Sequence, residues 1–243
     1  KPCKYIIVSE AGASIYSASQ LAAEEFPDFD VMQRSAVSIA RRLQDPLAEL
    51  VKIDPKGIGI GQYQHDMKQA RLDEALGGVV ESCVNAVGVD INTASYSLLS
   101  YIAGINQTAA KNIVKYREEN GAFTTRGQVT KVPRIGAKAF QQCAGFLRVP
   151  GGREALDNTG VHPESYDCAR RLLSMFGYSE ADIANGGLTG LRQKVVRKGM
   201  QSVCEALEVG EPTLADIITE LEKPGRDIRE GFDAPVLRED VLS

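Results

Sequence analysis

Two short turns in the middle of the chain carry residues suited to holding an anion. The first is Ile102-Ala103-Gly104-Ile105-Asn106, and a shift of 30 residues places it on Val132-Pro133-Arg134-Ile135-Gly136. In each copy we expect an apolar helix to end, a hairpin to follow, and a second helix to begin with unpaired N–H groups. Such groups, at the positive end of a helix dipole, favour a phosphate. The sequence therefore predicts a duplicated helix–hairpin–helix with a phosphate-binding surface.

The chemistry of the turn differs between the two copies. A tight turn needs residues that tolerate unusual backbone angles, and glycine or asparagine meets this need best. The first copy has Gly104 and Asn106, whereas the second has Arg134 and Gly136. Arg134 either adds a cation to the surface or prevents the close approach of a ligand backbone, and the sequence leaves both alternatives open.

Basic residues are concentrated around these turns. The 243-residue chain has a formal net charge of −4, yet residues 98–150 contain eight basic and two acidic residues, a net of +6. Because phosphate contacts carry no base information, binding here would be independent of sequence. The alternative is that the hairpins are plain turns and the bases a solvated face. The predicted contacts are Gly104, Ile105, Asn106, Thr108, Lys111, Arg134, Ile135, Gly136 and Lys138.

Two acidic residues suggest a different chemistry, the metal-dependent hydrolysis of a phosphodiester bond. Glu10 follows a strand-like segment, and Asp45 precedes a helical one. Nuclease sites of this kind gather several carboxylates around Mg²⁺. Two carboxylates of unknown separation fall short of that, so helix capping or a surface position is the preferred interpretation of both. We expect no catalytic residue, no metal and no cofactor.

Three further stretches invite a functional interpretation. The glycine-rich Gly57–Gly61 lacks the GxGxxG spacing, which favours a packed loop over a nucleotide site. His65 and Asp66 have no nearby nucleophile, which favours capping or hydrogen bonding between domains over catalysis. The basic stretch from Arg192 to Lys198 is either another nucleic-acid contact or a solvated helix face, and the second interpretation is preferred.

Composition indicates a globular protein with no membrane partner. Apolar residues make up 43% and charged residues 25% of the chain, and no apolar run approaches the roughly 20 residues that span a bilayer. The five cysteines form no CxxC pair and there are only two histidines, which favours reduced thiols in a cytoplasmic protein over a disulfide framework or a zinc site. Because the chain begins at Lys1 without Met, we expect a fragment of a longer protein.

The pattern along the chain predicts a mainly α fold with an α/β remnant at the N-terminus. Lys4–Val8 is typical of a buried strand, followed by a helix that Pro27 stops and a second one that Pro46 breaks or kinks. The remaining expected helical regions are 68–87, the helix–turn–helix copies within 90–149, 163–207 and 213–223.

Several stretches of the sequence resemble known families. The segment from "VDINTASYSLLSYIAGINQTAAKNIVKYREENGAF" to "VPRIGAKAF" is similar to the tandem helix–hairpin–helix domain of competence DNA receptors. More closely, "VSEAGASIYSAS", "RSAVSIARRLQDPLAELVKIDPK", "GIGQYQHD", "CVNAVGVDINTAS", "LDNTGVHPESY" and "LEKPGRDIR" resemble the Tex family, bacterial transcription-accessory proteins that bind nucleic acid. This second resemblance covers nearly the whole chain, in the order of the family.

The Tex resemblance implies a domain organisation. Residues 1–65 would be the end of a YqgF/RuvC-like domain with an RNase H-like fold, residues 75–150 the tandem helix–hairpin–helix domain, and residues 151–230 a helical wedge domain. Residues 231–243 would lead into an oligonucleotide-binding β-barrel after Ser243, and a helical region would precede Lys1.

The resemblance and the residues together favour nucleic-acid binding, to RNA or DNA, without catalysis, with transcription machinery as a second class of partner. Two alternatives stay open. One is a metal-dependent nuclease in the full-length protein that uses Glu10 and Asp45, and the other is a scaffold that binds no nucleic acid.

Overall fold

A computed structural model describes residues 6–59, 61–184, 188 and 190–223. Over these residues the protein is mainly α-helical, as the sequence predicted, with a single pair of two-residue strands. The chain divides into two compact units, which meet in sequence between Cys83 and Val84. None of the described helices is long and apolar enough to cross a membrane.

The first unit contains short helices around a small apolar cluster made by Tyr16, Ala22 and Ile53. The strand expected at Lys4–Val8 is not observed where the structure can test it, because Ile6–Val8 has no regular structure and Lys4 and Tyr5 lie outside the described residues. The helices of this unit are α1 (Ala13–Ser17), α2 (Gln20–Glu25), α3 (Val31–Gln44) and α4 (Pro46–Leu50), followed by the 3₁₀ turns η1 (Pro55–Ile58) and η2 (Gln64–Asp66).

Proline and capping residues define the ends of these helices, as the sequence indicated. α2 ends at Glu25, shortly before Pro27, and α3 stops before Pro46. Asp45 lies between α3 and α4, and its carboxylate accepts the Ala48 N–H at 3.0 Å. Proline then occupies the first turn of α4, where its missing N–H costs nothing.

Buried charges in the first unit are paired with one another. The Lys52 ammonium is 3.0 Å from the Glu25 carboxylate and 2.8 Å from the Glu49 carboxylate. The hydroxyls of Ser38 and Tyr16 donate to these two carboxylates, Ser38 to Glu49 and Tyr16 to Glu25. Burial is the main reason that the pKa of the Tyr16 phenol is raised, so this hydroxyl remains a donor.

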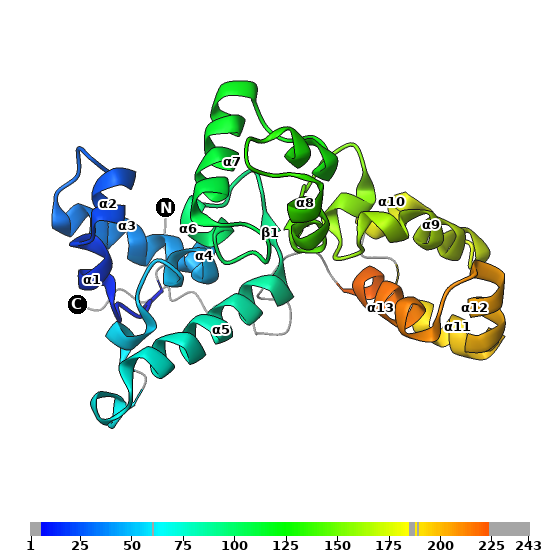
Figure 1. The fold of residues 1–243 in the computed structure, drawn as a ribbon, viewed down its shortest axis with the longest axis horizontal. Coiled ribbons are helices and arrows are strands. Elements are labelled where there is room, and N and C mark those ends of the chain that lie inside the picture. Colours follow the sequence, from blue (N-terminus) through cyan, green and yellow to red (C-terminus); the bar gives the residue numbers. More distant parts are fainter. Residues whose placement is uncertain (1–5, 60, 185–187, 189, 224–243) are drawn as a thin grey trace, which may run out of the picture. The chain divides into compact units, whose positions relative to one another are not determined.

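The helix α5 (Gln69–Val87) runs from the first unit into the second, and Figure 1 shows it unbroken across Gly77 and Gly78. The tandem helix–hairpin–helix follows. It is bracketed by β1 (Val89–Asp90) and β2 (Leu147–Arg148), which pair in parallel with Val89 opposite Leu147. Its helices are α6 (Tyr96–Leu99), α7 (Gln107–Asn120), η3 (Arg126–Lys131), α8 (Ala137–Cys143) and η4 (Ala144–Phe146).

The last region is a helical domain with its own apolar core. Buried residues of α9, α11, α12 and α13, among them Leu172, Leu191, Val203 and Ile218, form this core. The expected helical region 163–207 is in fact several helices, and the last expected helix is present. The elements are η5 (Ala155–Asn158), η6 (Pro163–Ser165), α9 (Tyr166–Met175), α10 (Glu180–Ala184), α11 (Leu191–Lys198), α12 (Met200–Leu207) and α13 (Glu211–Glu222).

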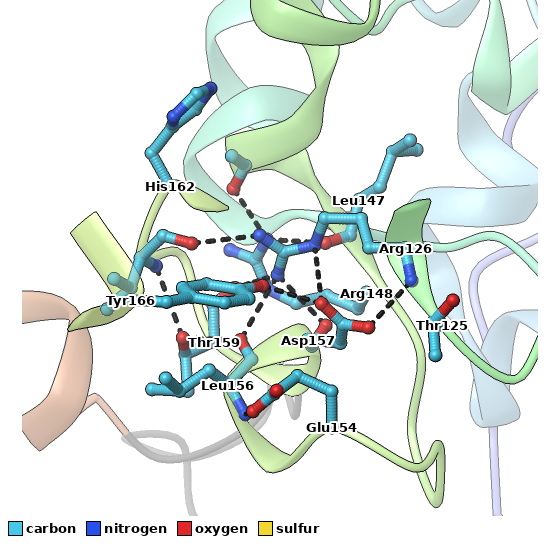
Figure 2. Close-up of polar contacts among 12 residues, drawn as sticks. Thr125, Arg126, Leu147, Arg148, Glu154, Leu156, Asp157, Thr159, His162 and Tyr166 are labelled. Atoms are coloured by element: carbon cyan, nitrogen blue, oxygen red, sulfur yellow. Dashed lines mark hydrogen bonds and ion pairs between the residues drawn. The ribbon is translucent and has the colours of Figure 1, made fainter. Parts of the chain in front are cut away.

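A buried arginine connects the second helix–hairpin–helix copy to the helical domain (Figure 2). The Arg126 side chain is fully buried and donates to the backbone carbonyls of Val161 (2.8 Å), Thr159 (2.5 Å), Asp157 (2.9 Å) and Leu156 (3.3 Å). Its own backbone N–H donates to the Asp157 carboxylate at 2.6 Å. The loop that begins the helical domain is therefore wrapped around one guanidinium group.

The partners of Arg126 are also fixed by hydrogen bonds. The Tyr166 hydroxyl donates to the second oxygen of the Asp157 carboxylate at 2.6 Å. Burial lowers the pKa of the Arg126 guanidinium, while Tyr166 and Asp157 act in the opposite direction. The charge is thus retained in the interior because polar groups of the loop surround it.

We predict that Arg126→Met lowers the free energy of unfolding by about 3–5 kcal/mol, because the substitution leaves several buried carbonyls and Asp157 without their cation. Urea unfolding followed by circular dichroism measures this. The control is Arg153→Met, at an exposed arginine of the same unit, which should change stability by no more than about 0.5 kcal/mol. An Arg126→Met protein as stable as this control would show that the buried guanidinium is dispensable.

Candidate nucleic-acid interface

The two turns predicted from the sequence are hairpins of the same geometry. In the first, the Ile105 N–H donates to the Ile102 carbonyl at 3.0 Å, and in the second the Ile135 N–H donates to the Val132 carbonyl at 3.1 Å. The residue before each isoleucine has a left-handed backbone, with φ of +82° at Gly104 and +74° at Arg134. The 30-residue shift found in the sequence therefore corresponds to a structural repeat.

Of the two turn positions singled out from the sequence, only the one occupied by Gly104 and Arg134 has unusual backbone angles. Asn106 and Gly136 have ordinary extended angles, with φ of −83° and −84°, and they cap the helices α7 and α8. Asn106 accepts the Ala109 N–H through its side chain at 2.9 Å, so its role is helix capping and not a left-handed turn. Gly136 has no side chain that could do the same.

This difference changes what each helix start offers to a ligand. In α7, the Asn106 side chain already satisfies one of the first N–H groups. In α8, the glycine cap makes no such side-chain bond, so more of the first-turn donors are left for solvent or an anion. The second hairpin is therefore the more open of the two.

Two of the predicted contact residues have their side chains in the protein core. Ile105 and Ile135 are each only 4% exposed, and their N–H groups are used inside the hairpins. They anchor the turns and present neither a side chain nor an N–H to a ligand. The other predicted residues are exposed: Gly104, Asn106, Thr108, Lys111, Arg134, Gly136 and Lys138.

Each hairpin lies against the second helix of the other copy. A Cβ atom at Gly104 would lie 2.8 Å from the Gln142 Cβ and 3.1 Å from the Ala139 carbonyl oxygen, so α8 packs closely on the first hairpin. In the reciprocal contact, the Asn112 amide of α7 donates to the Pro133 carbonyl at 2.9 Å. The two turns are thus held in one structural unit by each other's helices.

Fewer of the basic residues within 98–150 lie at the surface than the sequence suggested. Arg117 donates to the Ile91 carbonyl at 2.7 Å, and burial lowers its pKa. Arg126 and Arg148 are buried, and Arg148 donates to the Gly145 carbonyl at 2.6 Å. These three arginines are structural. The exposed cations are Lys111, Lys115, Lys131, Arg134 and Lys138.

With exposed Glu118 and Glu119 counted, the surface of this segment carries a net charge of +3 and not +6. Lys115 lies 3.7 Å from Glu119 and is partly neutralised by it. Lys111 is held with its ammonium 4.9 Å from the centre of the Tyr96 ring. The cations without a carboxylate partner among the described residues are therefore those at the hairpins, Lys111, Arg134 and Lys138, together with Lys131.

The acidic residues and short stretches singled out in the first unit lie at helix ends, in packed positions and in turns. Asp45 is a helix cap, as preferred, and Glu10 is exposed ahead of α1. No group of three or more His, Cys, Asp or Glu side chains arranged to hold a metal occurs in the part of the chain that the structure describes. Gly57 packs against Ile15, where a Cβ would lie 2.4 Å from the Ile15 Cδ1, and His65 and Asp66 are exposed in the turn η2.

Comparisons with known proteins agree with this architecture. Residues 1–44 match the Tex protein YqgF-like domain, residues 84–148 the helix-hairpin-helix motif, and residues 154–229 the HHH domain. The third match means that the region after the tandem pair is itself of the helix–hairpin–helix class.

Similar proteins cover almost the whole chain. The transcriptional accessory protein Tex of Neisseria gonorrhoeae is 58% identical over 97% of this chain and 30% of its own length. Protein tex of Bordetella pertussis is 56% identical over 97% of this chain and 29% of its own. The human S1 RNA-binding domain-containing protein 1 is 42% identical over 98% of this chain and 29% of its own.

The chain thus spans somewhat less than a third of the length of the curated relatives that it matches. Within that span the three domain matches follow one another along the chain, and the hairpin geometry is present twice in the tandem region. The chain belongs to the Tex family of transcription-accessory proteins.

Proposed function

We propose that the tandem helix–hairpin–helix binds the sugar–phosphate backbone of nucleic acid without reading its sequence. The observation that carries this proposal is the repeated hairpin with three unpaired cations beside it, Lys111, Arg134 and Lys138. A lysine at such a place attracts a phosphate as a point charge and needs no fixed geometry. The first-turn N–H groups of α7 and α8 supply the remaining donors.

We further propose that the full-length protein acts on nucleic acid during transcription, in the cytoplasm, and that both RNA and DNA are ligands. Two relatives support this, since one is named a transcriptional accessory protein and another an S1 RNA-binding domain-containing protein. Backbone contacts of the kind described do not depend on the base.

The hairpin proposal predicts that Lys111→Glu together with Lys138→Glu weakens binding to all sequences about equally. For duplex DNA, the slope of log K against log salt should flatten by roughly 0.9 for each phosphate that the variant no longer neutralises. Folding should be nearly unaffected, because exposed charges change stability by no more than about 0.5 kcal/mol. Fluorescence anisotropy with random-sequence DNA and RNA across a salt series measures the affinity and its salt dependence.

The matched control is Lys115→Glu with Lys68→Glu, which makes the same change of net charge at two exposed lysines outside the hairpins. This variant should bind almost as well as the parent. If the folded double-Glu variant instead binds as tightly as the parent, the hairpins are structural turns, and the scaffold alternative is the better account.

Arg134 offers a separate test, because its backbone conformation and its charge can be changed independently. A left-handed residue other than glycine costs on the order of 1 kcal/mol. We predict that Arg134→Gly raises the free energy of unfolding by about this amount relative to Arg134→Ala. Both variants lack the cation, so both should bind nucleic acid more weakly and to the same extent.

The comparison also decides what the Arg134 side chain does in the complex. If Arg134→Gly binds more tightly than the parent, the side chain obstructs the approach of the ligand backbone and contributes no useful cation. Thermal unfolding and anisotropy on the same three proteins provide the data.

We propose, finally, that this chain acts by binding and does not cleave nucleic acid. Glu10 is exposed and the Asp45 carboxylate caps a helix, an arrangement that does not favour a metal site shared by the two carboxylates. Labelled single- and double-stranded substrates incubated with Mg²⁺ or Mn²⁺ should remain intact. Cleavage that Glu10→Ala abolishes would favour the nuclease alternative.

A further inference from the structure

The turn before α11 in the helical domain resembles the two tandem hairpins, as does the turn before α1, where the Ala13 N–H donates to the Glu10 carbonyl at 2.9 Å and Gly12 has a φ of +71°. The Leu191 N–H donates to the Leu188 carbonyl at 3.1 Å, and Gly190 has a φ of +90°. This is the same hydrogen bond and the same left-handed position as at Gly104 and Arg134. The helix that follows differs, because α11 begins directly at Leu191 and the Lys194 N–H already donates to the Gly190 carbonyl at 3.1 Å.

The start of α11 is closed by a carboxylate of the protein itself. The Arg192 N–H donates to Glu222 of α13 at 2.7 Å, and the Arg192 Nε lies 3.7 Å from the same carboxylate. The Arg192 guanidinium also donates to the Thr219 hydroxyl at 2.7 Å. An internal anion thus occupies the place where a ligand phosphate would meet the main chain, so any ligand of α11 must be held by side chains.

The cations of this domain fall into two groups according to their partners. Half of those described are paired with carboxylates: Arg170 contacts three, Arg171 lies 3.9 Å from Glu208, Arg192 lies 3.7 Å from Glu222, and Lys223 is paired with Glu220. On α11, by contrast, no carboxylate among the described residues lies within ion-pair distance of Lys194, Arg197 or Lys198, and all three are exposed. Unpaired positive charge is concentrated on this one helix.

This concentration does not follow from the composition of the domain. Residues 151–223 contain twelve acidic and eight basic residues, so the domain as a whole is acidic. Spacings of three and four residues place Lys194, Arg197 and Lys198 on the same side of α11. An acidic domain that keeps one helix face free of its own carboxylates presents that face to an anionic partner.

Two of the three cations are positioned by aromatic rings. The Lys194 ammonium is 4.0 Å from the centre of the Tyr178 ring, and the Lys198 ammonium is 5.5 Å from that of Phe176. Both rings pack against the apolar core of the domain. Attraction to a ring face holds an ammonium group without neutralising its charge, so these lysines remain able to bind an anion.

The cations of α11 have the same sequence offsets from the left-handed residue as those of the other two hairpins. Lys194 lies four residues after the left-handed Gly190, as Lys138 lies four residues after Arg134. Arg197 lies seven residues after Gly190, as Lys111 lies seven residues after Gly104. The positions along the helices differ, because α11 begins one residue after its left-handed residue, whereas α7 and α8 begin three residues after theirs.

We infer that the face of α11 formed by Lys194, Arg197 and Lys198 is a second nucleic-acid contact, which binds backbone phosphates through side chains alone. The choice of nucleic acid over an acidic protein rests on the proposed function of the tandem hairpins, beside which exposed cations without a carboxylate partner also lie. The contact is independent of those hairpins, since it lies on a different helix with its own hairpin.

The test is the double variant Lys194→Gln with Arg197→Gln in the whole chain. Binding of random-sequence duplex DNA should become several-fold weaker near physiological salt, and the slope of log K against log salt should flatten by about 1.8, for two phosphate contacts. The control is Arg171→Gln with Lys223→Gln, which removes the same charge from cations that carboxylates already neutralise. Its affinity should stay close to that of the parent.

The hairpin variant Lys111→Glu with Lys138→Glu is measured beside it, so that the two proposals can fail separately. If the hairpin variant weakens binding and the folded α11 variant binds like the parent, the α11 contact is overturned and the hairpin function stands. If only the α11 variant weakens binding, the α11 contact stands and the hairpin function is wrong. A decrease in affinity equal in the α11 variant and its control would also overturn the inference, because it would report net charge alone.

Discussion

The arrangement of the second unit depends on one buried guanidinium group. An arginine removed from water is tolerated only when its hydrogen bonds are made inside the protein. At Arg126 the two terminal nitrogens donate to the carbonyls of residues 156, 157, 159 and 161, and Nε lies 3.8 Å from the Asp157 carboxylate, which requires the chain after β2 to curl around the side chain. Since Arg126 also begins η3, which leads into the second hairpin, the hairpin and the helical domain share this anchor.

The same requirement divides the arginines and lysines by their roles. Arg117, Arg126 and Arg148 satisfy main-chain carbonyls, a task suited to a planar group with five donors. The cations left at the surface of the tandem region are mostly lysines, namely Lys111, Lys115, Lys131 and Lys138, with Arg134 as the exception. A count of charges from the sequence therefore exaggerates the field that a nucleic acid would meet, although its sign is right.

Much of the fold could be predicted because it depends on local signals. Pro46 separates two helices, and the 30-residue repeat aligned Arg134 with Gly104, the two residues that the structure shows to share a left-handed backbone. The pairing of Val89 with Leu147 could not be predicted, because two-residue strands are too short to show any periodicity. Contacts between residues distant in sequence could not be predicted either, such as the hydrogen bond from the Arg192 N–H at the start of α11 to the Glu222 carboxylate.

The two hairpins of the tandem pair are related by geometry and yet not equivalent in what they can do. Gly104 cannot be replaced by a larger residue, since α8 leaves no room for a Cβ and the backbone is left-handed. Arg134 has the same backbone angle but projects its side chain into solvent, so only conformational strain opposes a side chain there. That strain places a cation next to the start of α8, which has no side-chain cap, and the proposed phosphate contact would find the most donors there.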